Sequence, residues 1–153
     1  MKILARSVEE TIRIGEKLGS LVNSGDIICL TGELGTGKTH FTKGFARGLK
    51  IEDYITSPTF TIVNEYEGRL KLNHFDVYRI EDPDEVNAIG FDEYIFGSAV
   101  SIIEWANFIE ELIPEECIKV NIKKVPAEGD NYREIEISYK GQRYSYVKEI
   151  DIC

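Results

Sequence analysis

The chain has 153 residues, 42% of them hydrophobic and 29% charged, which is ordinary for a single folded domain over residues 1–153. Its apolar runs are shorter than the ~20 residues that span a bilayer, and it begins without the apolar stretch of a secretory signal, so we expect a cytoplasmic protein with no membrane association. The net charge of −9 repels a nucleic-acid backbone, so any role with RNA is expected to run through a partner protein.

The three cysteines predict no metal centre. Cys29, Cys117 and Cys153 are far apart in the sequence and show no CxxC or Cys/His spacing. Cys29 lies in the apolar run 27–30, where a thiol usually packs as a small buried hydrophobe.

The first predicted element is a helix from Ser7 to about Val22. Ser7 and Glu10 have the spacing of a capping box, and apolar residues then recur at three- and four-residue steps until Gly25. The continuous apolar run over 26–30 predicts a strand covered on both faces.

Later elements alternate between helical and extended patterns. We expect a helix over 38–49, two strands within 60–78 around a Glu67–Gly68 turn, a short helix after Pro83, a buried strand over 99–103, a helical stretch to Leu112, and strands over 117–123 and 133–139. This order predicts a mainly parallel sheet flanked by helices, with antiparallel additions.

A glycine-rich loop carries the strongest functional signal. It reads Gly32-Glu33-Leu34-Gly35-Thr36-Gly37-Lys38-Thr39 and matches GxxxxGK[ST] at every fixed position. Glycines let backbone N–H groups curl around a phosphate, and the helix that follows adds its partial positive charge. Lys38 is expected to reach the β- and γ-phosphates, and the Thr39 hydroxyl to ligate Mg²⁺. Because the loop joins a buried strand to a helix, we expect a P-loop NTPase fold.

A carboxylate for hydrolysis is predicted at the end of the strand over 99–103. Glu104 stands where a Walker B carboxylate is found, with Glu in place of the more common Asp. It would bind Mg²⁺ directly or through water, or polarise the attacking water; the structural alternative is a cap for the next helix. Trp105 is a core candidate whose ring, beside a nucleotide pocket, would report occupancy.

A third cluster follows the turn at residues 67–68. His74, Asp76 and Tyr78 share one face of the predicted strand, and Arg79 follows. Asp76 is a candidate for positioning water or metal ligands, and Arg79 for meeting a γ-phosphate or a partner. A histidine at this spacing serves structure as often as function. Whether Asp76 or Glu104 lies nearer the metal stays open.

The segment 56–61 lies between the loop helix and the next strand. Segments in this position often become ordered around a γ-phosphate, and Thr59 is the candidate sensing hydroxyl. The alternative is an ordinary Ser-Pro turn before a strand.

Four segments together resemble one family. They are GELGTGKTHFTKGFARGL at 32–49, SPTFTIVNEY at 57–66, HFDVYR at 74–79 and IIEW at 102–105. Their order and spacing are similar to those of the bacterial threonylcarbamoyladenosine-biosynthesis ATPase family (TsaE). The phosphate loop alone is shared by many families, whereas HxDxYR followed by a short helix and then EW is more specific. Nothing is carried over beyond residue 114.

The resemblance implies an ATPase that supports attachment of threonylcarbamoyl to adenosine 37 of tRNAs that read codons beginning with A. It implies two protein partners, a metallo-transferase and its non-catalytic paralogue, with an ATP cycle that resets the complex. By position, the family's Mg²⁺-binding threonine falls on Thr39, its acidic site on Glu104 and the motif aspartate on Asp76. His40, where relatives often carry a small polar residue, is a mild variation.

Two other functions fit a phosphate loop. A small-molecule kinase would carry an arginine-rich lid, but Arg69 and Arg79 are too few and too scattered to form one. A nucleotide-dependent interaction switch would bind without hydrolysis, and Glu104 argues against that reading without deciding it. The sequence has no NKxD guanine motif, which favours adenine.

Overall fold

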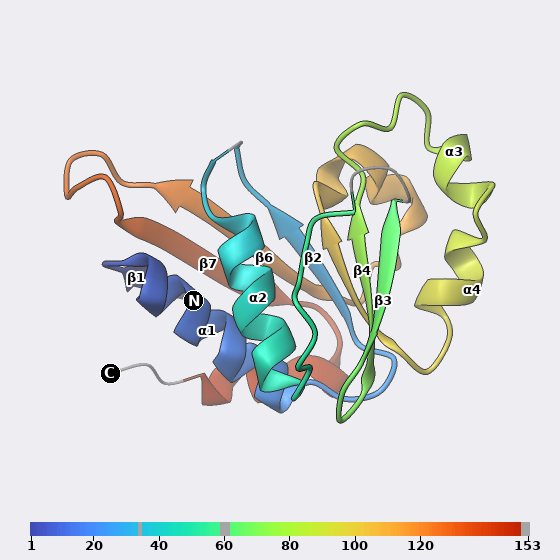
Figure 1. Ribbon diagram of the computed structural model, residues 1–153, viewed down its shortest axis with the longest axis horizontal. Coiled ribbons are helices and arrows are strands. Elements are labelled where there is room, and N and C mark those ends of the chain that lie inside the picture. The colour runs from blue at the N-terminus through green and yellow to red at the C-terminus, as the bar shows by residue number, and fades with distance from the viewer. Residues whose placement is uncertain (34, 59–61, 151–153) are drawn as a thin grey trace.

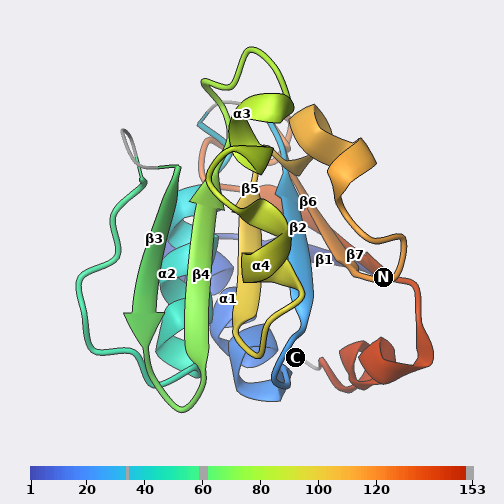
Figure 2. The same ribbon diagram turned by 90° about the vertical axis from the view of Figure 1, so that its right-hand side faces the viewer.

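A mixed sheet forms the centre of the molecule (Figures 1 and 2). The computed structural model describes residues 1–33, 35–58 and 62–150, and in this part of the chain the sheet has seven strands in the order β1-β7-β6-β2-β5-β4-β3. Their bounds are β1 (Lys2–Ala5), β2 (Ile27–Thr31), β3 (Val63–Glu67), β4 (Lys71–Asp76), β5 (Val100–Glu104), β6 (Ile118–Lys124) and β7 (Arg133–Tyr139). β2 pairs in parallel with β5 and β6, and β4 pairs in parallel with β5, whereas β3, β7 and β1 add antiparallel edges. The predicted α/β class with a parallel centre is confirmed.

Helical segments cover both faces of the sheet (Figure 2). One face packs against α1 (Val8–Leu21) and α2 (Lys38–Gly48), and the other against α3 (Asp84–Asn87), α4 (Phe91–Ile95) and the 3₁₀ segment η1 (Ala106–Leu112). The first four residues of β2 are apolar and buried on both faces of the sheet. Ile28 and Leu30 join the core under α1 and α2, while Ile27 and Cys29 join the other core.

The two helices of the first face approach closely through glycines. A Cβ on Gly44 of α2 would lie 1.9 Å from the carbonyl oxygen of Ile12, and one on Gly15 of α1 would lie 2.2 Å from that of Phe41. Backbone therefore meets backbone at this crossing. Because α2 begins at the phosphate loop, the crossing fixes the loop relative to α1.

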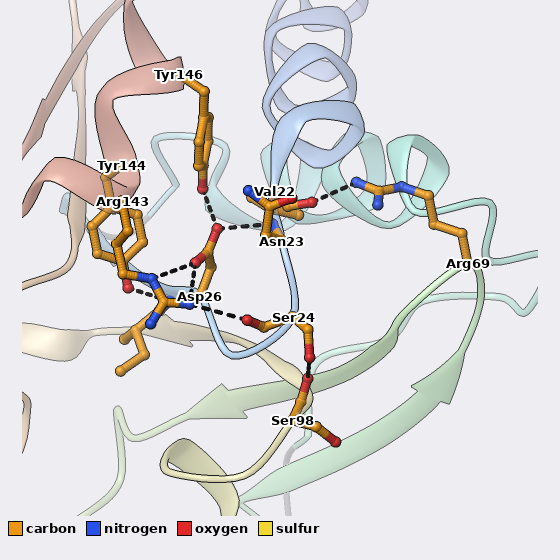
Figure 3. A network of polar contacts seen from close by, with 10 residues as sticks. Val22, Asn23, Ser24, Asp26, Arg69, Ser98, Arg143, Tyr144 and Tyr146 are labelled. Carbon is orange, nitrogen blue, oxygen red and sulfur yellow. Dashed lines mark hydrogen bonds and ion pairs between the residues drawn. The ribbon is translucent and has the colours of Figure 1, made fainter.

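A network of polar contacts anchors the last described segment, η2 (Gln142–Glu149), to the turn before β2 (Figure 3). The fully buried carboxylate of Asp26 accepts hydrogen bonds from the Tyr146 hydroxyl (2.5 Å), Arg143 Nε (3.1 Å) and the backbone N–H of Asn23 (2.8 Å). Burial, together with Asp26 as acceptor, raises the pKa of Tyr146. A buried carboxylate is stable here because all of these donors compensate its charge.

The predicted elements are present, with differences at both ends of the chain and around β5. β1, α4 and η2 were not predicted, and the predicted helix before Leu112 is a 3₁₀ segment broken at Ile109 (φ −129°, ψ 27°). The Ser7 cap is confirmed, since its hydroxyl accepts from Glu10 N at 3.2 Å, although Glu10 itself accepts from Arg6 N. Among the described helices, none is long and apolar enough to cross a membrane.

Candidate functional site

The glycine-rich loop lies between β2 and α2, at the carboxyl end of the central strand (Figure 1). Gly35 and Gly37 have φ values of 80° and 104°, a left-handed backbone in which other L-residues are strained. Gly32 passes so close to its neighbour that a Cβ would lie 2.6 Å from the carbonyl oxygen of Ile122. A larger residue would strain the backbone at Gly35 or Gly37 and would clash with β6 at Gly32. Leu34 lies outside the described residues.

Lys38 places its ammonium group within the loop. Its Nζ donates to the carbonyl oxygens of Gly32 (2.7 Å) and Glu33 (2.8 Å). Burial lowers the pKa of Lys38, and the charges of Glu104 and Asp76 partly offset this shift. The ammonium group of Lys38 therefore interacts electrostatically with both carboxylates.

The Trp105 ring lies against the ammonium group of Lys38. Its ring centroid lies 3.9 Å from Lys38 Nζ, a cation–π distance, and its backbone has a positive φ of 62°. The ring also contacts Tyr78 at 4.6 Å and Phe108 at 5.6 Å between centroids. The half-buried ring therefore lies beside the loop, a place from which its environment would change with occupancy.

Two carboxylates face the loop from neighbouring strands. Asp76 and Glu104 are register partners at the carboxyl ends of β4 and β5. Burial raises the pKa of Asp76, and the nearby charge of Glu104 adds to this, while the Tyr78 N–H that it accepts at 3.0 Å acts in the opposite direction. Parallel strands bring these two motifs together because their carboxyl ends lie at the same edge of the sheet.

His74 holds one oxygen of Glu104. His74 Nε2 and Glu104 Oε2 are 2.5 Å apart, the imidazole is fully buried, and the carboxylate is 3% exposed. His74 Nδ1 has no hydrogen-bond partner among the described residues. From the sequence, a structural and a functional role for His74 were equally open. In the structure His74 directly contacts Glu104.

The other predicted residues are placed as follows. Thr39 Oγ1 lies 3.5 Å from Ser57 Oγ, so the segment after α2 reaches the loop through Ser57. Thr59, the candidate γ-phosphate sensor, lies outside the described residues. Arg79 is exposed and does not border the cleft described below, so nothing in this arrangement brings it to a phosphate.

The phosphate loop over 35–39, Asp76, Glu104 and Trp105 border one cleft of about 450 Å³, and Ser57 and Tyr78 border it too. Beyond the predicted residues, the cleft is also bordered by Val8 and Thr11 of α1 and by Asn131 and Arg133 of the β6–β7 hairpin. Sequence reasoning missed these four because they stand outside every motif. Only the position of α1 directly before the loop strand offered a signal for the first two.

The parallel centre, the loop between β2 and α2, and the facing strand-end carboxylates define a P-loop NTPase-like α/β protein. The family model described as "Threonylcarbamoyl adenosine biosynthesis protein TsaE" matches residues 5–135. The chain belongs to this family.

Curated relatives and a solved structure agree with this membership. A "tRNA threonylcarbamoyladenosine biosynthesis protein TsaE" from Bacillus subtilis is 46% identical over 142 residues, which cover 92% of this chain and 87% of that protein. One of the same name from Treponema pallidum is 40% identical, over 90% of this chain and all of that protein. The crystal structure of Bacillus subtilis YdiB superposes with a TM-score of 0.80 at 41% identity, covering 97% of this chain and 91% of that one.

Proposed function

We propose that this protein is a cytoplasmic, Mg²⁺-dependent ATPase that supports threonylcarbamoylation of adenosine 37 in tRNAs reading codons that begin with A. Family membership supports the pathway, because the family description and the relatives carry it in their names. The observation that carries the ATPase assignment is one cleft in which Lys38 faces the paired carboxylates Asp76 and Glu104.

Phosphate binding follows from the loop. Backbone N–H groups over 35–39 and the start of α2 supply partial positive charges, and Lys38 supplies a full one. Because Lys38 already donates to two loop carbonyls, its ammonium is held in place before a ligand arrives. Such preorganisation lowers the ordering cost of binding.

The donor set fits Mg²⁺. The groups bordering the cleft near the loop are the Thr39 hydroxyl and the Asp76 and Glu104 carboxylates, all oxygen donors. Mg²⁺ usually takes the rest of its ligands from phosphates and water. Thr39 and Glu104 would hold the ion, which would neutralise charge on the β- and γ-phosphate oxygens.

Hydrolysis requires an oriented water or an oriented metal ligand. Glu104 offers a carboxylate with little freedom, because His74 engages one of its oxygens and the surroundings bury it. Asp76 stands beside it as a second acceptor. An acceptor held rigidly needs no reorganisation when charge develops, which is the main source of electrostatic catalysis.

We infer that tRNA is reached through proteins, namely a metallo-transferase and its non-catalytic paralogue. The net charge of −9 supports this, since phosphate backbones are bound by neutralising Lys and Arg.

The test is ATP hydrolysis by the purified protein, measured alone and with the two partner proteins. We expect slow turnover alone and a higher rate with both partners. ATP binding without hydrolysis in the full mixture would favour an interaction switch instead. Rapid phosphorylation of a small metabolite, with no stimulation by the partners, would make the protein a kinase.

A further inference from the structure

The cleft extends to both sides of the loop strand. The strand order places β5 and β4 on one side of β2, and β6 and β7 on the other (Figure 1). Asp76 and Glu104 lie on the β4–β5 side, where the proposed function puts the metal and the γ-phosphate. The cleft continues from there to the β6–β7 side, where Asn131 and Arg133 border it and where it offers room for the sugar and base of the same nucleotide.

Carbon atoms of Thr11 and His40 lie beside the loop glycine Gly37. Thr11 Cγ2 and His40 Cδ2 both lie 4.0 Å from the place that a Cβ on Gly37 would take. The Thr11 hydroxyl is already directed to the Ser7 carbonyl, at 3.4 Å, so its methyl group remains for the cleft. Val8 also borders the cleft. A surface of this kind suits the flat face of a purine.

Arg133 ties the hairpin to the loop. Its Nε donates to the Thr36 carbonyl oxygen at 2.7 Å, and its Nη1 donates to the carbonyls of Asp130 (2.7 Å) and Tyr132 (2.9 Å). The structure has no cis peptide among the described residues, so the Thr36 carbonyl and the Gly37 N–H point to opposite sides of one planar group. By holding the carbonyl, Arg133 fixes the direction of the Gly37 N–H.

Asn131 adds an amide group to the β6–β7 side of the cleft. It is exposed in the turn between β6 and β7 and borders the cleft. Its amide offers one donor and one acceptor side by side, which is the complement of the adenine edge at N6 and its neighbouring ring nitrogen. Guanine presents two adjacent donors at N1 and N2, for which a carboxylate is the matching partner. The only described carboxylates that border the cleft, Asp76 and Glu104, lie on the β4–β5 side.

We propose that the β6–β7 hairpin forms the nucleoside wall of the cleft, with Asn131 contacting the adenine edge and Arg133 holding the phosphate loop in its binding geometry. The proposal rests on the proposed nucleotide-binding function and assigns the base-contacting residues. Asn131 is a specificity residue, and Arg133 is a positioning residue that acts through Thr36 and Gly37.

Calorimetry with two probes, Mg·ATP and Mg·tripolyphosphate, separates the two roles. Asn131→Ala should weaken ATP binding by roughly 5- to 10-fold, the loss expected for one hydrogen bond, and leave tripolyphosphate binding unchanged. The matched control is Asn107→Ala, because Asn107 is an exposed asparagine that does not border this cleft. It should change neither affinity.

Exchanging the amide for a carboxylate tests specificity. Asn131→Asp removes the donor and offers two acceptors, so the ratio of ATP to GTP affinity should fall relative to the unmodified chain. The ratio cancels the general repulsion that an added negative charge exerts on any triphosphate.

Two variants of Arg133 test positioning against charge. Arg133→Met keeps most of the side-chain length without a donor and should weaken ATP and tripolyphosphate alike. Arg133→Gln restores a donor for the Thr36 carbonyl without the charge and should recover most of both affinities. Because Gln and Met are equally neutral, a merely electrostatic or packing role would leave the two variants alike.

The outcomes are distinct from failure of the proposed function. Equal changes in ATP and tripolyphosphate affinity for Asn131→Ala, or no change in either, would overturn the base contact. Equal affinities of the Met and Gln variants would overturn the positioning role. If the unmodified chain bound neither probe, the proposed function itself would fail.

Discussion

The surroundings of Asp76 disfavour the ionised form of its carboxyl group. Burial and the neighbouring Glu104 raise its pKa above that of an exposed aspartate. In the unfolded chain the same carboxyl ionises at lower pH, so its negative charge opposes folding at neutral pH. A carboxyl in a cleft whose pKa is shifted by burial and a neighbouring charge is a typical candidate for a group that acts on a ligand.

Replacing this charge should stabilise the nucleotide-free protein. We expect Asp76→Asn to raise the thermal unfolding temperature at pH 7, because an amide has no charge to desolvate and its oxygen still accepts the Tyr78 N–H. The gain should disappear as pH falls through the raised pKa, since the unmodified carboxyl is then protonated in the folded state. Unfolding curves from pH 4 to 8 test this, and a lower unfolding temperature for the variant at pH 7 would refute it.

At the scale of elements, the crossing of α1 and α2 positions the site. α2 begins within the phosphate loop, and α1 carries Val8 and Thr11, which border the cleft. The two helices meet backbone to backbone at Gly44 and Gly15. A small shift at this crossing would therefore move both ends of the cleft relative to each other.

Gly44→Ala separates packing from helix propensity. Alanine in an exposed helix is more stabilising than glycine by about 1 kcal/mol, but here its Cβ would lie 1.9 Å from the Ile12 oxygen. Overpacking of this kind costs about 1–3 kcal/mol, so we expect net destabilisation in urea unfolding. The exposed Arg47→Ala in the same helix serves as control and should change stability by less than about 0.5 kcal/mol. A stabilised Gly44→Ala would contradict the close crossing.

Elements with a local pattern could be predicted from the sequence. α1 has a cap and a helical period, β2 has a continuous apolar run, and the loop has its glycines. β1 has only four residues and exists by pairing with β7, while η2 depends on Asp26, over a hundred residues away in the sequence. Such elements are set by tertiary partners, which no local window contains.

The same distinction divides the site. Lys38, Asp76 and Glu104 were predictable because each lies in a motif whose strand end fixes its place at one edge of the sheet. Asn131 and Arg133 reach the cleft only because β7 pairs with β6 and turns back beside the loop. Cys29 and Cys117 show the same effect: they are distant in sequence, yet their sulfur atoms lie 3.8 Å apart in the core.

At the scale of the whole molecule, the strand order brings the phosphate loop and the two carboxylates together at one edge of the sheet. β2, β5 and β4 are parallel neighbours, so the loop and both carboxylates meet at their carboxyl ends, the usual ligand-binding edge of an α/β sheet. The antiparallel β6–β7 hairpin extends this edge on the other side. The net charge of −9 on the whole chain is the ground for the proposal that tRNA is reached through protein partners.

The central claim, that this cleft binds ATP through Lys38 and hydrolyses it with Glu104, is tested most directly by comparing two variants with the unmodified chain, with both partner proteins present. ATP affinity and turnover are measured on the same samples. We expect Lys38→Ala to weaken ATP binding, because it removes the charge that faces the phosphates, and Glu104→Ala to slow turnover by about 100-fold or more while affinity changes much less. Normal turnover by Glu104→Ala in the full mixture would contradict the account.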